Sequence, residues 1–452
     1  MRSLATLCLV LTFAADGLGA ARPNIIFILA DDLGYGDLGC YGQKRIKTPN
    51  LDKLAADGVR FTQVYSGSTV CAPSRCALMT GLHTGHARVR GNGGFFLTPN
   101  DTTVAAALKK VGYVTACVGK WGLGDAGSAG VPSRHGFDHF FGFLNHTHAH
   151  NYYPDHLYRH EEKVPLRNVQ EKGVATRRVE YAPDLFAADA IAFVEANKAK
   201  PFFLYFAATL PHANNEKTNA DGNGNEVPSA APYANEDWPQ PEKDKAAMIT
   251  RLDADVGKLL AKLKELGLEN NTLVLFSSDN GPHREGGNTI EFFGSAGPLR
   301  GFKRSLTDGG IRVPALARWP GVVKPGTESA HVWAFWDVFP TLCDLAGAEP
   351  PKGLDGISFL PTLTGKGEQK AHEFLYWEFH EGGTKQAVLH KNWKAIRLVP
   401  GAPLELYDLS KDVGEKTNFA GANPEIVKAV DSYLKSARTE SKDWPIREPK
   451  KK

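Results

Sequence analysis

Four stretches of the chain are almost entirely apolar, and each is followed closely by polar residues. They cover residues 24–30, 113–118, 201–208 and 273–277. Apolar runs of this length are typical of strands that are buried on both faces of a sheet. Between the last two runs, apolar residues recur at spacings of three and four, which predicts an amphipathic helix ending at Gly267; they are Met248, Leu252, Val256, Leu259, Leu263 and Leu266.

The same alternation is found near the N-terminus. Thr48-Pro49-Asn50 favours a helix start, Gly58 favours its end, and residues 59–64 suit another strand. Strands that alternate with helices favour a parallel sheet, because each crossover helix packs on the sheet. We therefore predict an α/β fold with a large, mostly parallel sheet flanked by helices.

The pattern changes after residues 365–370, which are rich in Gly, Lys and Gln. Residues 373–379, 386–398 and 404–409 then suit short antiparallel strands, and a last apolar helical repeat comprises Ile426, Val430 and Leu434. We expect a large domain, residues 22–368, that carries the candidate chemistry, and a small C-terminal α+β subdomain, residues 369–452. The polar segment 214–244 is expected to be a long surface excursion.

Residues 1–21 have the pattern of a secretory signal peptide, with Arg2, a mostly apolar run from Leu4 to Ala14, and then small residues. This run is too short to span a bilayer, and no later segment is long enough. We therefore expect a secreted or periplasmic protein without a membrane span. The net charge of +3 over 452 residues gives no indication of nucleic-acid binding.

The four apolar runs lead into residues that carry chemistry. In chain order these are Asp31 and Asp32, Lys120, His212, and Asp279 and Asn280. Ligands of open α/β sheets bind beyond the carboxyl ends of the strands, so we expect one shared site. The carboxylate and amide oxygens suit Ca²⁺, and less well Mg²⁺, rather than zinc. The alternative is that residues 31–34 form an ordinary solvated turn.

Cys71-Ala72-Pro73-Ser74-Arg75, followed by Thr80-Gly81, resembles the signature of the type I sulfatases. Residues 30–37 and 277–281 likewise resemble the metal-binding segments of that family, which includes arylsulfatases and N-acetylgalactosamine-6-sulfatase. The resemblance implies an alkaline-phosphatase-like fold. It also implies that a formylglycine-generating maturation enzyme oxidises Cys71 to formylglycine, whose hydrate attacks the sulfur of a sulfate ester. The alternative for this segment alone is a helix-capping loop with a buried cysteine.

The resemblance assigns further roles to the residues named above. One Ca²⁺ is held by Asp31, Asp32, Asp279 and Asn280 together with an oxygen of the formylglycine made from Cys71. The cations that bind the sulfate group or its nucleophile are Arg75, Lys120 and Lys303. His212 resembles the histidine that contacts the ester oxygen and helps the alcohol to leave.

One position departs from the family pattern. The family has Gly-Lys-Trp-His-Leu-Gly, whereas this chain has Gly119-Lys120-Trp121-Gly122-Leu123-Gly124. In the family, that histidine takes a proton from the hydrated aldehyde. We expect a substitute base from residues 145–153 or 83–86. His148 and His150 are candidates for the base or for sugar contacts, Tyr152 is a candidate for stacking on a sugar ring, and a zinc site on the three alternating histidines is the alternative.

Three functions stay open at this point. The resemblance favours a sulfatase, and the aromatic and histidine-rich loop favours a sulfated carbohydrate as its substrate. A phosphatase or phosphodiesterase of the same fold is the first alternative, and stoichiometric zinc would favour it. A catalytically impaired relative that binds sulfated glycans is the second, and Gly122 is the observation that favours it.

Overall fold

The computed structural model describes residues 22–448, so the predicted signal peptide lies outside it. The main sheet has eleven strands in the order β12-β2-β11-β10-β1-β9-β3-β4-β5-β6, with β13 beside β2. Their bounds are β1 Asn24–Ala30, β2 Val59–Tyr65, β3 Val114–Lys120, β4 His139–Phe143, β5 His156–Arg159, β6 Glu162–Pro165, β9 Phe202–Ala207, β10 Thr272–Ser278, β11 Arg312–Arg318, β12 Thr327–Ser329 and β13 Trp333–Ala334.

The centre of the sheet is parallel, as predicted. Strands β10, β1, β9, β3 and β4 run in one direction, with Ile25 of β1 opposite Leu273 of β10 and Phe203 of β9. The four apolar runs of the sequence form β1, β3, β9 and β10. Antiparallel pairs follow on both sides, β10 with β11 and β11 with β2 on one, and β4 with β5 and β5 with β6 on the other. The carboxyl ends of the four apolar strands therefore lie along one edge.

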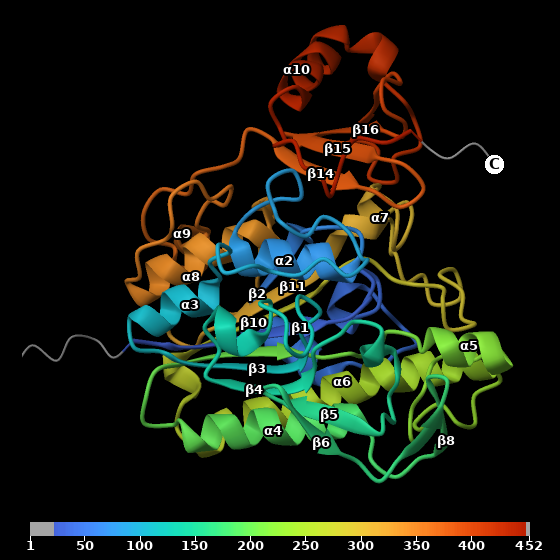
Figure 1. The fold of residues 1–452 in the computed structure, drawn as a ribbon. Helices are drawn as coiled ribbons and strands as arrows, with labels where there is room; N and C mark the ends of the chain where they lie inside the picture. The colour runs from blue at the N-terminus through green and yellow to red at the C-terminus, as the bar shows by residue number, and fades with distance from the viewer. Residues whose placement is uncertain (1–21, 449–452) are drawn as a thin grey trace, which may run out of the picture.

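Helices cover both faces of this sheet (Figure 1). Alternate residues of β1 face two different cores: Ile25, Phe27 and Leu29 pack with α2, α3 and α8, and the residues between them pack with α1, α4 and α6. The helix bounds are α1 Pro49–Ala56, α2 Cys71–Thr80, α3 Val104–Lys110, α4 Ala182–Ala196, α5 Asn215–Asp221, α6 Gln240–Glu265, α7 Asp308–Ile311, α8 Val338–Ala346, α9 Leu360–Thr364 and α10 Pro424–Leu434. The amphipathic pattern before Gly267 is confirmed as α6.

A separate antiparallel sheet lies above α2 in Figure 1, with α10 on its far side. Its strands are β14 Leu375–Phe379, β15 Lys385–His390, β16 Trp393–Arg397 and β17 Glu405–Asp408. The prediction of one strand over 386–398 is wrong, because the chain turns at Lys391, whose backbone is left-handed with φ 56°. Trp377 and Phe379 of this sheet share a core with Ala77 of α2, so the two sheets are packed together through α2.

Segment 214–244 is more ordered than the sequence predicts. It contains α5, and α6 begins inside it at Gln240. Two antiparallel strands, β7 Val169–Glu171 and β8 Val174–Arg177, form a small hairpin nearby. Among residues 22–448, no helix is long and apolar enough to cross a membrane.

Candidate active site

The polar residues that follow β1, β3 and β10 meet at the carboxyl edge of the sheet, together with His212 and the start of α2. The backbone N–H of Asp31 donates to the carbonyl of Leu210 at 3.1 Å, and that of Asp279 donates to the carbonyl of Ala30 at 3.0 Å. These bonds continue the pairing beyond the strands, so the ends of β1 and β10 stay side by side. The structure thus brings together the strand-end residues that the sequence placed on one rim.

Asp31, Asp32, Asp279 and Asn280 are all fully buried. The Asn280 amide donates from Nδ2 to Oδ1 of Asp32 at 2.6 Å, which leaves the Asn280 Oδ1 without a partner. Oδ1 of Asp31 is also buried without a hydrogen-bond partner. Buried oxygens are rarely left unpaired unless an ion or water completes them. These two oxygens therefore fit a cation with oxygen ligands.

The carboxylate charges beside Cys71 also indicate a cation site. Burial, and then the neighbouring carboxylate of Asp31, raise the pKa of Asp279 to about 7. One oxygen of Asp31, one oxygen of Asp279 and the Cys71 Sγ all lie within 4.8 Å of one another. Arg75 and Lys120 do not offset this repulsion at Asp279, and a bound cation would relieve it. Asp32 has a left-handed backbone, φ 65°, and its N–H donates to Oδ1 of Asp279 at 3.1 Å. The residues present thus suit one divalent cation.

Cys71 is the first residue of α2, so its side chain lies at the positive end of the helix. The thiol is buried, which raises its pKa and makes it a poor nucleophile as it stands. The side chain of Asn92 lies over it: Nδ2 is 3.9 Å from the Cys71 Sγ, and Oδ1 accepts from the N–H of Ala72 at 3.1 Å. Sequence reasoning missed Asn92, whose only signal is its place between Gly91 and Gly93.

Two buried cations are bound to the carboxylates of the site. Arg75 donates from Nε and Nη2 to Oδ2 of Asp279 at 3.0 and 2.8 Å, and also donates to the carbonyl of Lys120. The ammonium of Lys120 contacts Oδ2 of Asp31 at 2.7 Å. Both side chains are held in place by packing and by these bonds, so they form a preorganised positive lining.

Lys303 and His212 form a second unit beside Asp32. The Lys303 ammonium lies 2.8 Å from Oδ2 of Asp32, 2.8 Å from Oε2 of Glu285 and 3.2 Å from Nε2 of His212. Nδ1 of His212 donates to the carbonyl of Ala213 at 2.7 Å, so Nε2 is the acceptor. Burial, and then Lys303, lower the pKa of His212, which keeps the ring neutral. Lys303 therefore holds the proton between the two groups.

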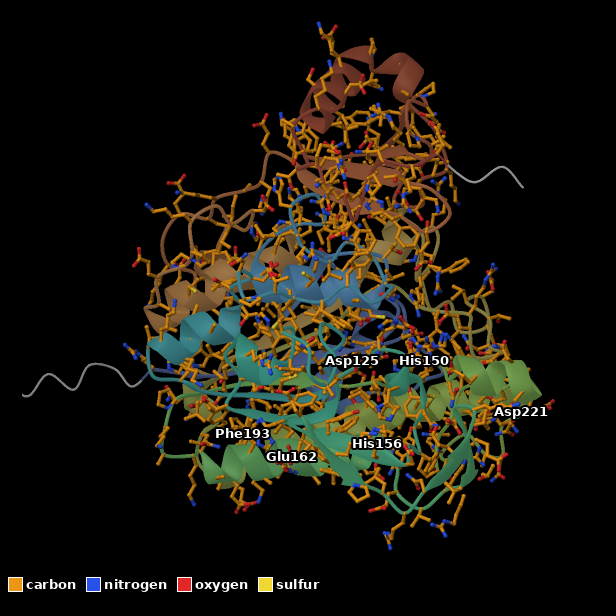
Figure 2. All side chains as sticks on the ribbon, viewed as in Figure 1. Asp125, His150, His156, Glu162, Phe193 and Asp221 are labelled. Carbon is orange, nitrogen blue, oxygen red and sulfur yellow. The ribbon has the colours of Figure 1, made fainter. Side chains whose placement is uncertain are left out.

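The histidines of residues 146–150 have three different environments, and among residues 22–448 no group of candidate metal ligands combines them. His150 stacks on His212 with ring centres 5.0 Å apart, and its Nδ1 pairs with Glu216 of α5 at 3.1 Å. Figure 2 labels His150 next to α5. His148 packs on Phe143 and His156, and its Nε2 is buried without a partner. This packing favours a structural role, and the role expected of His148 as a base or sugar contact stays a prediction.

His146 lies beside the position of the departure from the family pattern. The N–H of Gly122 donates to the carbonyl of Leu144 at 3.0 Å, so the pairing of β3 with β4 continues to this point. A Cβ atom built on Gly122 would be 3.9 Å from the Cβ of His146 and 3.9 Å from the Cδ of Arg75. Gly122 has φ 78°, a conformation that disfavours any side chain there. His146 thus borders the space that a residue-122 side chain would enter.

The expectation that Tyr152 stacks on a sugar ring is wrong. Tyr152 is only 1% exposed, and its ring stacks on that of Tyr181. Its hydroxyl donates to the carbonyls of Thr209 and His212. Tyr152 therefore positions the segment that carries His212 and has no face available to substrate.

Residues 83–86, the other expected source of a base, lie away from Cys71. They follow the C-terminal end of α2, about 15 Å from Cys71 at 1.5 Å per residue. His83 and His86 stack on each other at 4.4 Å and face Asp355.

The fold and this site define an α/β enzyme that can hold a cation and bind an anionic group beyond the carboxyl ends of parallel strands. Comparison with known families identifies the group. The model described as Sulfatase matches residues 23–348, and the model described as N-sulphoglucosamine sulphohydrolase, C-terminal, matches residues 301–441. The chain belongs to the sulfatase family, whose members are sulfuric ester hydrolases.

Individual relatives are similar over most of their length. Human arylsulfatase A is 35% identical over 480 residues, covering 93% of this chain and 89% of that protein. The N-acetylgalactosamine-6-sulfatase of Canis lupus familiaris is 33% identical, covering 86% and 74%. The solved structure of Ps i-CgsB in complex with k-i-k-neocarrahexaose has a TM-score of 0.79 and 30% identity, covering 94% and 95%. The sulfatase assignment is thereby confirmed over the phosphatase alternative.

Proposed function

We propose that this sulfatase hydrolyses a sulfate ester on a sulfated carbohydrate, with formylglycine at position 71 and one Ca²⁺, in a secreted or periplasmic location. The observation that carries the proposal is the pair of unpartnered buried oxygens, on Asp31 and Asn280, in the same buried cluster as the Cys71 side chain. The buried oxygen set favours Ca²⁺ over Mg²⁺, because Mg²⁺ retains several waters and demands a strict octahedron.

The metal ligands are Asp31, Asp32, Asp279 and Asn280, with an oxygen at position 71 as the fifth group. When present, formylglycine supplies a hydrated aldehyde as the nucleophile, which the buried thiol of Cys71 does not match. The start of α2 places the partial positive charge of the helix beside the sulfate. The bonds that Arg75 makes to Asp279 keep its guanidinium fixed beside the reacting oxygen.

Lys120 and Lys303 are the cations that bind the non-bridging sulfate oxygens. Their ammonium groups are fixed by Asp31 and by Asp32, so little reorganisation is needed as charge develops on these oxygens. His212 lies between Lys303 and the stacked ring of His150. In this arrangement the proton that Lys303 shares with Nε2 of His212 is available to the leaving alcohol.

His146 is the residue that we assign as the base in place of the family histidine. It is partly buried, and burial and then the charge of Lys120 lower its pKa to about 4, so its ring is neutral at pH 7. Its position beside Gly122 is the geometric support.

The carbohydrate substrate is supported by the relatives. One is named as an N-acetylgalactosamine-6-sulfatase, and one structure is a complex with k-i-k-neocarrahexaose. His150, half-buried next to His212, is the residue of the histidine-rich loop that we assign to sugar contact.

The test is peptide mass spectrometry across residues 69–79 of protein co-expressed with a formylglycine-generating enzyme, followed by sulfate release from N-acetylgalactosamine 6-sulfate and a panel of sulfated oligosaccharides. We expect an aldehyde at position 71 and release of sulfate, and neither in Cys71→Ala. An aldehyde-containing, Ca²⁺-loaded protein that binds these sugars without releasing sulfate would overturn the proposal. It would favour the impaired glycan-binding relative instead.

A further inference from the structure

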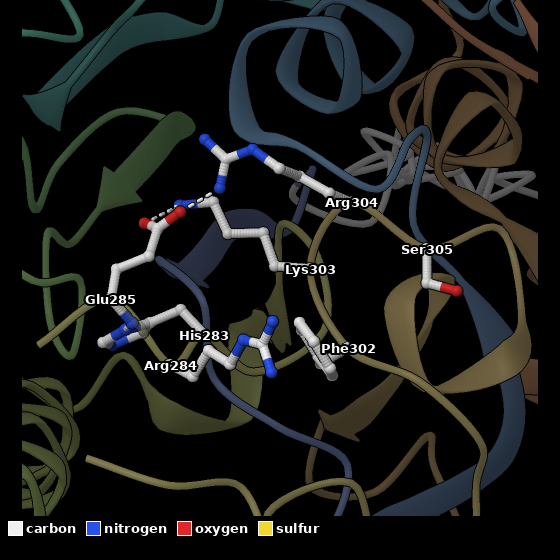
Figure 3. A pocket seen from close by; sticks show the side chains of 7 residues that line it. All are labelled: His283, Arg284, Glu285, Phe302, Lys303, Arg304 and Ser305. Atoms are coloured by element: carbon white, nitrogen blue, oxygen red, sulfur yellow. Dashed lines mark hydrogen bonds and ion pairs between the residues drawn. The ribbon is translucent and has the colours of Figure 1, made fainter. Parts of the chain in front are cut away.

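A cavity of about 380 Å³ adjoins the candidate active site (Figure 3). Two segments form it. Residues 283–285 follow Asp279 and Asn280, and residues 302–305 contain Lys303. The N–H of Lys303 donates to the carbonyl of Pro282 at 3.0 Å, which joins the two segments. Because the Lys303 ammonium contacts Asp32 and His212, one wall of the cavity is also part of the catalytic centre.

The lining is rich in cations. Arg284, Lys303 and Arg304 contribute positive charges, and Glu285 is the one carboxylate among the seven lining residues. Figure 3 shows the Glu285 carboxylate joined by dashed lines to Lys303 and Arg304; Oε2 contacts Lys303 and Oε1 contacts Arg304. Both oxygens of Glu285 are therefore engaged, and its negative charge is compensated within the wall.

Arg284 differs from the other two cations. Its guanidinium lies over the ring of Phe302, 4.5 Å from the ring centre, and the side chain is exposed. Among residues 22–448 no carboxylate pairs with it, whereas Arg304 also pairs with Glu381. A stacked guanidinium loses little further freedom when it binds a ligand, and its planar N–H groups suit a carboxylate or sulfate.

One residue of this wall has a backbone conformation that residues other than glycine seldom adopt. Arg304 has φ 73°, in the left-handed region, and its N–H donates to the carbonyl of Thr69 at 3.1 Å. Thr69 is two residues before Cys71, so the cavity wall is tied to the loop that positions the nucleophile. Such strain persists where the surroundings fix it, and it concentrates at functional sites.

We propose that this cavity is a subsite for a second anionic group of the substrate, bound by Arg284 beside the sulfate that is cleaved. The subsite rests on the proposed function and extends it: the preferred substrate carries a further carboxylate or sulfate near the scissile ester. The volume is within the range of pockets that hold a small ligand. Arg284 is the specificity-determining residue, and Glu285 positions Lys303 and Arg304.

Steady-state kinetics of the matured, Ca²⁺-loaded enzyme test this with three probes. N-acetylgalactosamine 6-sulfate carries no second anion, the unsaturated chondroitin 6-sulfate disaccharide adds a carboxylate, and N-acetylgalactosamine 4,6-disulfate adds a sulfate. In Arg284→Gln we expect KM for at least one of the two dianionic probes to rise about tenfold, the usual size of a charge-assisted bond, with KM for the monoanion unchanged. The probe that responds identifies the anion.

Arg300→Gln is the matched control. Arg300 is also stacked on one aromatic ring, 4.7 Å from the centre of Tyr407, but does not line the cavity. Its variant is expected to leave all three KM values unchanged, and Arg284→Lys to restore part of the loss. Equal KM values for the dianionic probes in wild type and Arg284→Gln would overturn the subsite. So would an equal rise for the monoanion. Sulfate release from the monoanion by the wild type tests the proposed function separately.

Discussion

Lys120 and Asp31 form a fully buried ion pair, 2.7 Å between Nζ and Oδ2, although their strands are separated by β9. The pair joins a residue proposed to bind sulfate to a residue proposed to bind the metal, so neither side chain can move without disturbing the other. We predict that Lys120→Ala lowers kcat/KM for an aryl sulfate at least 100-fold, as expected for loss of a preorganised cation. Circular dichroism and the Ca²⁺ content serve as controls, and a near-normal kcat/KM would contradict the role.

Calcium is predicted to stabilise the protein measurably. At a Ca²⁺ concentration 100 times Kd, binding to the folded state contributes about 2.7 kcal/mol. The Tm should therefore rise by several degrees on titration of chelator-treated protein, and Asp31→Asn should remove most of the rise. The measurement is thermal unfolding with Ca²⁺ and, in parallel, Mg²⁺. A wild-type protein whose Tm does not respond to Ca²⁺ would argue against the site.

His146→Gln is predicted to lower kcat about 100-fold with little change in KM, because a general base acts on the chemical step. Its direct observation is a histidine NMR titration, in which the His146 pKa should be about 4. Added imidazole should restore part of the activity of His146→Ala. His148→Phe is the control, since its ring packs among Phe143 and His156. Full activity of His146→Gln would place the base elsewhere.

Tyr152→Phe separates a positioning role from a substrate contact. The lost hydroxyl holds the carbonyls of Thr209 and His212, so we expect a several-fold lower kcat and an unchanged KM for every sugar tested. The same loss with an aryl sulfate would support positioning. A rise in KM confined to sugars would instead assign the hydroxyl to a sugar contact.

His83 makes stability depend on pH. Burial lowers its pKa to about 4, from a usual value near 6.5. Between pH 6.5 and pH 4 the unfolded chain binds a proton at His83 and the folded protein does not. Lowering the pH through this range therefore lowers the free energy of unfolding, by about 3 kcal/mol in total. Urea unfolding of His83→Asn, which keeps an acceptor for the N–H of Gly85, should show a shallower decline. Equal slopes for both proteins would assign the dependence to other groups.

The sequence predicted the parallel core well because its strands are buried on both faces, which leaves a continuous apolar run such as residues 24–30. It could not predict the turn at Lys391, because a left-handed lysine has no compositional signal. The burial of Tyr152 was hidden too, since an aromatic residue in a polar loop suits a sugar site and a core equally. The places of His146 and Asn92 in the site depend on which strands and loops become neighbours in three dimensions, and no local sequence pattern indicates this.

Helix α2 is buried along its entire length, from Cys71 to Thr80. A segment in that state cannot enter the active site of another protein, since the C-terminal sheet and α8 would first have to separate from it. If Cys71 is oxidised enzymatically, that reaction must therefore take place before the chain has folded. The yield of active protein would then depend on the rate of modification relative to the rate of folding. Conditions that slow folding should therefore raise the fraction of chains that carry formylglycine.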